Sequence, residues 1–415
     1  MSNIRPLLKA AALTACIALA SYPIAADEPT ADTEAPSTFL DALRQGSVSG
    51  NFRYRFETVD DDTFSDSADA STLRTALAYT SAAYRGWTLK LAAENVAAIF
   101  DDDDYNNAGA GSLNNGVRGV PVVADPELTD MLEASLTYRN DTLTAILGRQ
   151  EINLGDQRFV GAVGWRQHHQ SFDAARFQIK ASDAVTVDYS YVNRVHRIFG
   201  DDLDMAGHLL FVPIKPAAGH SLTAYGFQLD YDRPSPFSTL TYGVEYVLTT
   251  QVSDSVGLRL ELEAAQQRDA GDNPLEIDTD YFLASTGWSF GKLGIDLTWE
   301  SLGDLGDGNR AFSTPLATLH KFNGWADKFL ATPSAGLETL YLRVKGAFGS
   351  GYKWQVSYQD YQATALSRDY GTELDAELVY TAPWKQSFGI KYADYDADTF
   401  SRDTQKLWIW TAVGF

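Results

Sequence analysis

Short stretches of strict alternation between apolar and polar residues dominate the chain. In residues 50–58, GNFRYRFET, the three aromatic side chains alternate with asparagine, arginine and glutamate. Residues 256–264, VGLRLELEA, and 293–301, LGIDLTWES, repeat the pattern with aliphatic side chains. A period of two indicates β-strands with one apolar and one polar face. A soluble β-sandwich and a membrane β-barrel both have this period, so further features must separate them.

The distribution of charges and rings favours a membrane barrel. The polar faces carry full charges at mid-strand, which suits a wet interior, and large aromatic residues lie toward the predicted strand ends, as in interfacial girdles. These end residues are Trp87, Tyr138, Trp288, Trp354 and Trp384.

Connection lengths give the same result. Tight turns at 85–86, 140–141, 182–183, 291–292 and 349–351 separate longer loops at 60–71, 100–129, 197–205 and 302–336. Outer-membrane barrels have short periplasmic turns and longer external loops. The chain also ends in KLWIWTAVGF, a strand pattern that closes on Phe415, as bacterial outer-membrane barrels usually do.

These features together predict an all-β fold, a transmembrane antiparallel up-and-down β-barrel. With both ends in the periplasm the strand count must be even, and about eighteen strands satisfy this rule. The even count requires a strand at 208–215, although Pro213 is tolerated there only near a strand end. Residues 47–415 form the predicted barrel domain.

The N-terminal residues predict export. A basic head with Arg5 and Lys9, a short apolar run and a small-residue pair at 25–26 indicate a signal peptide over residues 1–26. Cys16 lies in a stretch that also resembles a lipoprotein attachment box, an alternative that stays open. It is the only cysteine in the chain, so no disulfide is expected in the exported protein.

An acidic segment follows at residues 27–46. Residues 37–46, STFLDALRQG, predict a short periplasmic helix with Ser37 as its N-cap. Overall, 33 basic residues face 55 acidic ones and the formal net charge is −22, which excludes a nucleic-acid partner. Aspartate runs at 60–62, 101–104 and 201–202 predict solvated loops or, alternatively, Ca²⁺ bridges to lipopolysaccharide phosphates.

A polar, glycine-punctuated stretch at 148–177 carries the strongest candidate site. Arg149, Arg158, Arg166 and Arg176 would gather near the external mouth or in the lumen. Guanidinium groups are permanently charged planar donors that match carboxylates, as a channel for anionic solutes requires. The alternative is that these arginines pair with the acids of the same stretch and pin the loop to the wall. Those acids are Glu151, Asp156 and Asp173.

Several motifs in one order resemble the alginate export family of outer-membrane proteins. They are FRYRFE, ASTLRTALAY, AAENV, VVADPELT, RQEINLGDQRFVGAVGWRQ, RIFG and FSTPLATLHKFNGWADKFLATPSAGLETLY. The resemblance implies a monomeric 18-stranded barrel in a Gram-negative outer membrane, with an electropositive path for an anionic polysaccharide. The positions that it marks as pore cations are Arg53, Arg55, Arg74, Arg149, Arg158 and Arg166, whereas His168 and His169 depart from the family pattern.

Alternation alone adds further inward-facing cations. These are Arg194, Arg259, Arg343 and Lys345. Together with the six positions above and Arg176, they make up the predicted pore set. Inward acids are also numerous, so many of these charges must neutralise one another across neighbouring strands.

The predicted function is passive passage of anionic solutes, foremost an anionic polysaccharide or oligosaccharide such as alginate. A general or carboxylate-selective uptake porin is the alternative, and a narrow adhesion barrel is a weaker one. An enzyme is disfavoured because the six histidines are scattered and no nucleophile elbow occurs. No metal or cofactor is expected. The expected partners are the solute, outer-membrane lipid and lipopolysaccharide, and a periplasmic export partner.

The loop at 302–336 contains a further candidate element. Residues 315–332 have apolar side chains at spacings of three and four, which predicts an amphipathic helix with Thr314 as its cap. Its apolar face would pack inward against the barrel mouth, either as a constriction of the channel or as a rim cap that only stabilises the barrel.

Overall fold

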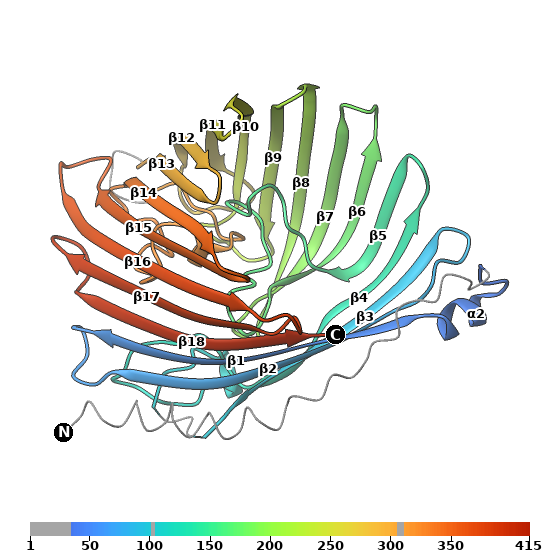
Figure 1. Ribbon diagram of the computed structural model, residues 1–415, viewed down its shortest axis with the longest axis horizontal. Coiled ribbons are helices and arrows are strands. Elements are labelled where there is room, and N and C mark those ends of the chain that lie inside the picture. The colour runs from blue at the N-terminus through green and yellow to red at the C-terminus, as the bar shows by residue number, and fades with distance from the viewer. Residues whose placement is uncertain (1–34, 101–103, 305–310) are drawn as a thin grey trace.

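The computed structural model describes residues 35–100, 104–304 and 311–415, and within them eighteen antiparallel strands form one closed barrel (Figure 1). The predicted signal peptide and two loop segments lie outside the described residues. The strands are β1 Ser47–Asp61, β2 Ala68–Thr80, β3 Trp87–Ala98, β4 Leu128–Arg139, β5 Leu143–Gln150, β6 Ser171–Lys180, β7 Thr186–His196, β8 Asp202–Ala217, β9 His220–Tyr231, β10 Thr239–Ser253, β11 Val256–Asp269, β12 Asp278–Phe290, β13 Leu293–Leu302, β14 Leu337–Phe348, β15 Tyr352–Gln362, β16 Asp369–Thr381, β17 Ser387–Ala397 and β18 Thr404–Gly414.

The barrel is closed by its first and last strands. Each strand pairs with the next along the chain, and β1 pairs antiparallel with β18 from Asn51 opposite Gly414 to Asp61 opposite Thr404. Closure leaves no unpaired sheet edge, which a structure in lipid requires. The all-β barrel and the strand that parity required, β8, are both confirmed. Pro213 pairs opposite Thr223 close to the end of the β8 ladder.

The outer surface carries the apolar half of the alternation. Large apolar side chains such as Leu136, Leu147, Leu260 and Leu340 are between about a third and a half exposed, although they belong to well-ordered strands. Such exposure suits contact with lipid. Rings pair near the short turns, as in Trp87 with Tyr138, whose centroids are 5.0 Å apart.

A short helix lies beside the barrel at the end that carries the short turns. It is α2, Phe39–Arg44, and Thr38 and Asp41 form a reciprocal capping box at its start. The predicted helix is therefore present but shorter, and its cap is Thr38, whereas Ser37 instead donates its hydroxyl to Asp41. By the rule for outer-membrane barrels this end is periplasmic. Among the described residues no helix is long and apolar enough to cross a membrane.

Three connections from the opposite end fold into the barrel (Figure 1). They are the loops after β3, after β5 and after β13, and one buried core cluster joins loop residues such as Val160, Phe312 and Phe329 to wall residues such as Tyr281 and Tyr395. The inward packing predicted for the loop after β13 is therefore observed. Loop also meets loop, because a parallel β-bridge joins Val160 to Leu316.

The helix predicted over residues 315–332 is wrong. The described part of this loop holds only one turn of 3-10 helix, η3, Leu319–Lys321. Asn323, Gly324 and Asp327 have φ values of 53°, 86° and 61°, and left-handed backbone at three such close positions stops a helix from continuing. Leu316, Trp325 and Phe329 are still buried, whereas Leu330 is 45% exposed, and the buried side chains reach different walls of the barrel rather than one face.

Candidate functional site

The loop after β5 is held in the lumen by close backbone approaches. A Cβ at Gly161 would lie 2.3 Å from the hydroxyl of Thr318, so the two loops meet where only glycine fits. The amide of Gly161 donates to the carbonyl of Leu316 at 2.9 Å, and Thr318 donates its hydroxyl to Gln157 at 2.7 Å. The loops after β5 and β13 therefore form one packed body inside the barrel.

Arg158 joins this body to the wall. Its Nε donates to Glu300 of β13 at 2.6 Å, and its guanidinium lies 4.8 Å from the ring centre of Phe322. The side chain is buried, and burial alone would lower its pKa, but the Glu300 carboxylate outweighs burial and raises the pKa. Arg158 therefore stays charged inside the barrel.

Arg166 makes a second attachment. It donates to Glu57 of β1 at 3.1 Å through Nη1 and to Asp327 of the loop after β13 at 3.0 Å through Nη2. Burial alone would lower its pKa, but the two carboxylates raise it. One guanidinium thus holds two loops to the wall.

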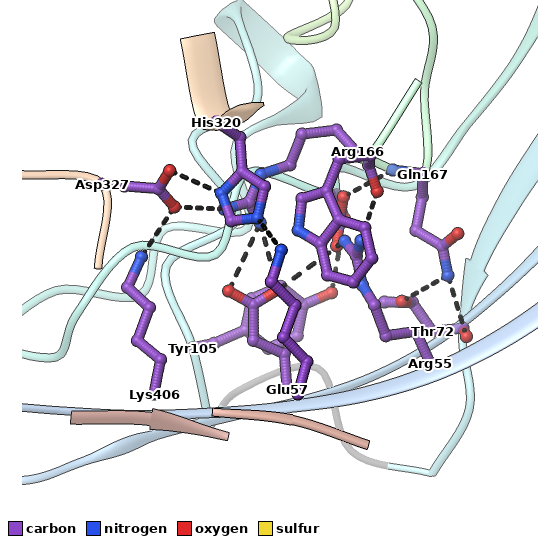
Figure 2. A network of polar contacts seen from close by, with 12 residues as sticks. Arg55, Glu57, Thr72, Tyr105, Arg166, Gln167, His320, Asp327 and Lys406 are labelled. Atoms are coloured by element: carbon purple, nitrogen blue, oxygen red, sulfur yellow. Dashed lines mark hydrogen bonds and ion pairs between the residues drawn. The ribbon is translucent and has the colours of Figure 1, made fainter. Parts of the chain in front are cut away.

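Asp327 is the centre of this network, as Figure 2 shows. Besides Arg166, it accepts from Lys406 of β18 at 2.8 Å and from Nδ1 of His320 at 2.7 Å. Burial would raise the pKa of its carboxyl, but His320, Lys406 and Arg166 hold the pKa well below its usual range. Asp327 is therefore an anionic centre held by three donors.

His320 lies between two charges. Its Nδ1 faces Asp327, its Nε2 lies 2.7 Å from Nζ of Lys391, and its ring stacks on Trp165 with centroids 5.1 Å apart. Burial lowers its pKa well below the ordinary value. Lys391 and Arg166 also lower the pKa, whereas Asp327 raises it. The low pKa keeps the imidazole neutral, and the contact with the Asp327 carboxylate assigns its proton to Nδ1.

A second group of contacts holds the loops after β3 and β5 against β1 and β2. Arg55 pairs with Asp125, and the backbone amide of Gln167 donates to the other oxygen of Asp125 at 2.9 Å. The side-chain amide of Gln167 donates to Oγ1 of Thr72 at 2.9 Å (Figure 2). Burial would raise the pKa of Asp125, but Arg55 and then Arg166 lower it. Asp125 thus joins two loops to the barrel wall.

Arg53 and Arg74 complete this side. Arg53 donates its Nε to Gln167 at 2.9 Å and its Nη1 to the carbonyl of Gly164 at 3.0 Å. Arg74 donates its Nη2 to Glu94 at 2.7 Å, and the other Glu94 oxygen lies 3.2 Å from the imidazole of His168. Both arginines orient loop backbone or neighbouring carboxylates.

A cavity of about 1060 Å³ lies at the long-loop end, above the packed loops. Its lining combines the charged groups above with apolar side chains such as Phe64, Phe199 and Leu316. The basic groups in the lining are Arg158, Arg166, Arg197, Arg233, Lys328 and Lys406. Acidic residues also line the cavity, and one of them, Asp61, pairs with Lys328 at 2.5 Å.

Below the loops the lumen is lined by strand residues. Arg176 pairs with Asp188 at 2.6 Å and Lys345 with Asp296 at 2.6 Å. Arg259 pairs with Glu261. The first two pairs confirm that inward charges neutralise one another across strands, whereas Arg259 and Glu261 both belong to β11.

Arg343 of β14 differs from them. Its Nε is buried without a hydrogen-bond partner among the described residues, and its guanidinium lies 5.5 Å from the ring centre of Tyr341. It lines a small pocket under the loops together with Lys321 and Glu300. Its remaining donors therefore face the lumen.

Two of the predicted pore residues lie elsewhere. Arg149 pairs with Asp173 at 3.1 Å and Arg194 with Asp204 at 2.6 Å, and both pairs lie on the outward face of the wall. Leu147, on the same face of β5 as Arg149, is 43% exposed. Strict alternation places Arg194 on the inward face, but a bulge between Val192 and Arg194 turns its side chain to the outward face.

The predicted pinning of the loop is observed, largely through other partners. Only Asp173 pairs with an arginine of the stretch, whereas Glu151 contacts His169 at 2.7 Å and Asp156 lies 3.8 Å from Lys321. The arginines instead reach acids far along the chain. Alternation alone predicts that Lys391 faces inward, whereas the sequence did not indicate Asp125, His320, Asp327 and Lys406. Asp125 lies in VVADPELT, and His320 and Asp327 lie in FSTPLATLHKFNGWADKFLATPSAGLETLY, so the quoted motifs were the available signal.

The model of a family described as alginate export matches residues 44–292, well over half of the chain. The chain belongs to the alginate export family. No protein of curated function matches this family member by sequence.

Solved porins share its fold. OpdK of Pseudomonas aeruginosa, solved with vanillate, is 15% identical over 90% of this chain and 99% of that one, with a TM-score of 0.71. OccAB2 of Acinetobacter baumannii gives the same values, and OccK9 (OpdG) of P. aeruginosa is 14% identical over the same shares with a TM-score of 0.72. This alginate export family member is therefore an outer-membrane β-barrel protein, and the solved porins are similar to it in fold.

Proposed function

We propose that this porin conducts small solutes that carry a carboxylate. The observation that supports the proposal is a track of basic side chains along the packed loops. Arg158 lines the cavity at the long-loop end, Lys321 and Arg343 line the small pocket beneath, and Lys345 follows on the same face of β14. A carboxylate entering from outside would meet fixed donors in succession.

Arg343 is the key residue of this track. The other cations have a carboxylate or carbonyl partner, whereas Arg343 keeps donors that no described residue occupies. Its planar fork suits a carboxylate in the lumen, and the Tyr341 ring beside it offers a face to the rest of the solute. Solute selection would then depend on one unpaired cation rather than on the net charge of the chain.

The filling of the lumen favours small solutes over a polymer. Buried pairs such as Arg158 with Glu300 and Arg166 with Asp327 join the loops to the wall. A polymer of sugar rings would have to separate such pairs, and breaking one buried pair costs about 3–5 kcal/mol. A single uronate or aromatic acid could occupy the cavity of about 1060 Å³ at the long-loop end without separating these pairs.

A liposome-swelling assay tests the proposal with a matched pair of solutes. Glucuronate and glucose have nearly the same size and differ in charge, so faster swelling in glucuronate is expected, and Arg343→Gln should remove most of the difference. Equal swelling rates in the two solutes would refute carboxylate selection.

Passage of an anionic polysaccharide is the second candidate, and family membership favours it. Release of oligouronates of increasing length from loaded vesicles separates the two. We expect release to stop at the shortest oligomers, whereas unhindered release of long chains would support the polysaccharide.

A further inference from the structure

A row of alternating charges crosses the outer wall of the barrel. Arg149 of β5 lies directly opposite Asp173 of β6, Asp173 opposite Arg194 of β7, and Arg194 opposite Asp204 of β8. Four neighbouring strands thus present cation, anion, cation and anion at one level. The channel has no use for these side chains if they face away from the lumen.

The neighbours of each residue in the row fix its direction. Phe172 and Ala174, on either side of Asp173, belong to the core cluster inside the barrel, so the Asp173 side chain points outward. Met205, next to Asp204, belongs to the same cluster. Arg194 precedes Val195, which is also a member. The row therefore lies on the outward face of the wall, and Asp204 also borders the cavity at the long-loop end.

The row interrupts the apolar belt. Arg149 and Trp299 lie equally far along their strands. Each is the sixth residue after the first residue of its strand, which is Leu143 in β5 and Leu293 in β13. Trp299 lies on the face of Leu297, which is 45% exposed to lipid. At the level where β13 is still apolar, β5 to β8 already carry charges, so polar headgroups must reach this part of the wall.

The arginines keep donors for a ligand. Arg194 donates through Nε to Asp204 at 2.6 Å, and among the described residues its two terminal nitrogens have no hydrogen bond; its side chain is 39% exposed. Arg149 uses Nε for Asp173 and Nη1 for the carbonyl of Met131, which leaves Nη2. The carboxylates hold each guanidinium from its Nε side, so Arg194 offers both terminal nitrogens to a bidentate anion and Arg149 offers its Nη2.

We propose that this row, Arg149, Asp173, Arg194 and Asp204, binds the phosphorylated headgroup of lipopolysaccharide in the outer leaflet. The partner follows from position and charge: the face lies in the outer membrane, toward the long-loop end, and its free donors are guanidinium groups that match phosphate. The apolar residues just below the row, Leu147 and Leu210, contact the acyl chains of the same glycolipid. The row fixes the depth and rotation of the barrel in the outer leaflet.

Native mass spectrometry of the full chain in detergent, titrated with diphosphoryl lipid A, tests this. The double variant Arg149→Gln and Arg194→Gln should bind lipid A at least about tenfold more weakly, since charge-assisted hydrogen bonds to two phosphates are lost. Arg268→Gln is the matched control, because Arg268 is outward and exposed on β11 but outside the row, and its affinity should equal that of the parent.

Other outcomes overturn the proposal. Parental affinity in the folded double variant would do so, and so would equal binding of dephosphorylated lipid A, which would mean that acyl chains alone are recognised. Binding that EDTA abolishes but the double variant retains would assign the ligand to carboxylate-bound cations instead. A dimer that the substitutions dissociate would make the row a contact between two copies. If the double variant does not fold, Arg194→Gln alone, at the more exposed pair, must still weaken binding severalfold.

Discussion

Arg166 and Asp327 are 161 residues apart in the chain and form an ion pair of 3.0 Å inside the barrel. Arg166 belongs to the loop after β5 and Asp327 to the loop after β13, and each is also bound to the wall, through Glu57 and Lys406. The contents of the lumen are thus a single network rather than independent loops.

Replacing Arg166 should destabilise the whole assembly. Arg166→Gln leaves Glu57 and Asp327 buried with an uncompensated charge, and we expect a loss of about 3–5 kcal/mol in the free energy of unfolding. Urea unfolding in detergent micelles, followed by circular dichroism, measures it. Arg149→Gln, which removes a partly exposed outward pair, should cost about 1 kcal/mol or less. Equal costs for the two variants would contradict the role of the network.

Replacing Arg343 should alter selectivity without altering stability. Its Nε has no partner to lose, so Arg343→Gln should change the free energy of unfolding by no more than about 0.5 kcal/mol. The anion-to-cation permeability ratio, from reversal potentials in a salt gradient across planar bilayers, should fall. The outward Arg268→Gln should keep the parental ratio, and an unchanged ratio in Arg343→Gln would place the selective cation elsewhere.

His320 should make stability depend on pH. Burial, Lys391 and Arg166 keep its folded-state pKa well below the unfolded value of about 6.5, so below that pH the unfolded chain binds a proton that the folded protein does not. The free energy of unfolding should therefore fall as the pH decreases from about 6.5, by up to about 1.4 kcal/mol per pH unit.

His320→Asn provides the comparison, since it keeps a donor for Asp327 but cannot titrate. Its unfolding free energy should depend less on pH between about 6.5 and 4.5 than that of the parent. His169→Asn is the control, because His169 is only partly buried beside Glu151. Parallel pH profiles for the parent and His320→Asn would show that another group titrates.

Removing the centre of the loop after β13 should widen the channel. Replacing residues 315–332 by a short Gly-Ser linker takes away Leu316, Trp325 and Phe329, which are buried in the lumen. Single-channel conductance should rise severalfold, and solutes larger than glucuronate should enter. If this variant folds with parental conductance, the loop is only a rim cap. Phe329→Ala, which keeps the loop and leaves a cavity, should change stability more than conductance.

Local patterns were sufficient to predict the barrel. The period of two, the alternation of turn and loop lengths and the C-terminal Phe415 each depend on nearby residues, and parity then required the strand that became β8. The predicted helix over 315–332 failed for a related reason. Its spacing predicted the burial of Leu316, Trp325 and Phe329 but not the exposure of Leu330, and it carries no information on the left-handed backbone at Asn323, Gly324 and Asp327.

The pairing inside the lumen was beyond sequence reasoning. Arg158 pairs with Glu300 at a separation of 142 residues, whereas the nearby Asp156 accepts from the backbone amide of Arg158 rather than from its guanidinium. Arg194 was assigned to the lumen because strict alternation does not register a bulge. Which cation stays unpaired, as Arg343 does, depends on all the pairs formed around it.

The β1–β18 seam constrains how the chain is made. Every other ladder joins strands that follow each other directly, so hairpins can form locally as the chain emerges, but Phe415 and Gly50 exchange backbone hydrogen bonds of 3.1 Å across almost the full length of the barrel domain. Until β18 pairs with β1, both strands present open edges that would pair with any neighbouring chain. A chain that lacks β18 would therefore remain an open, aggregation-prone ribbon rather than a barrel with one strand fewer.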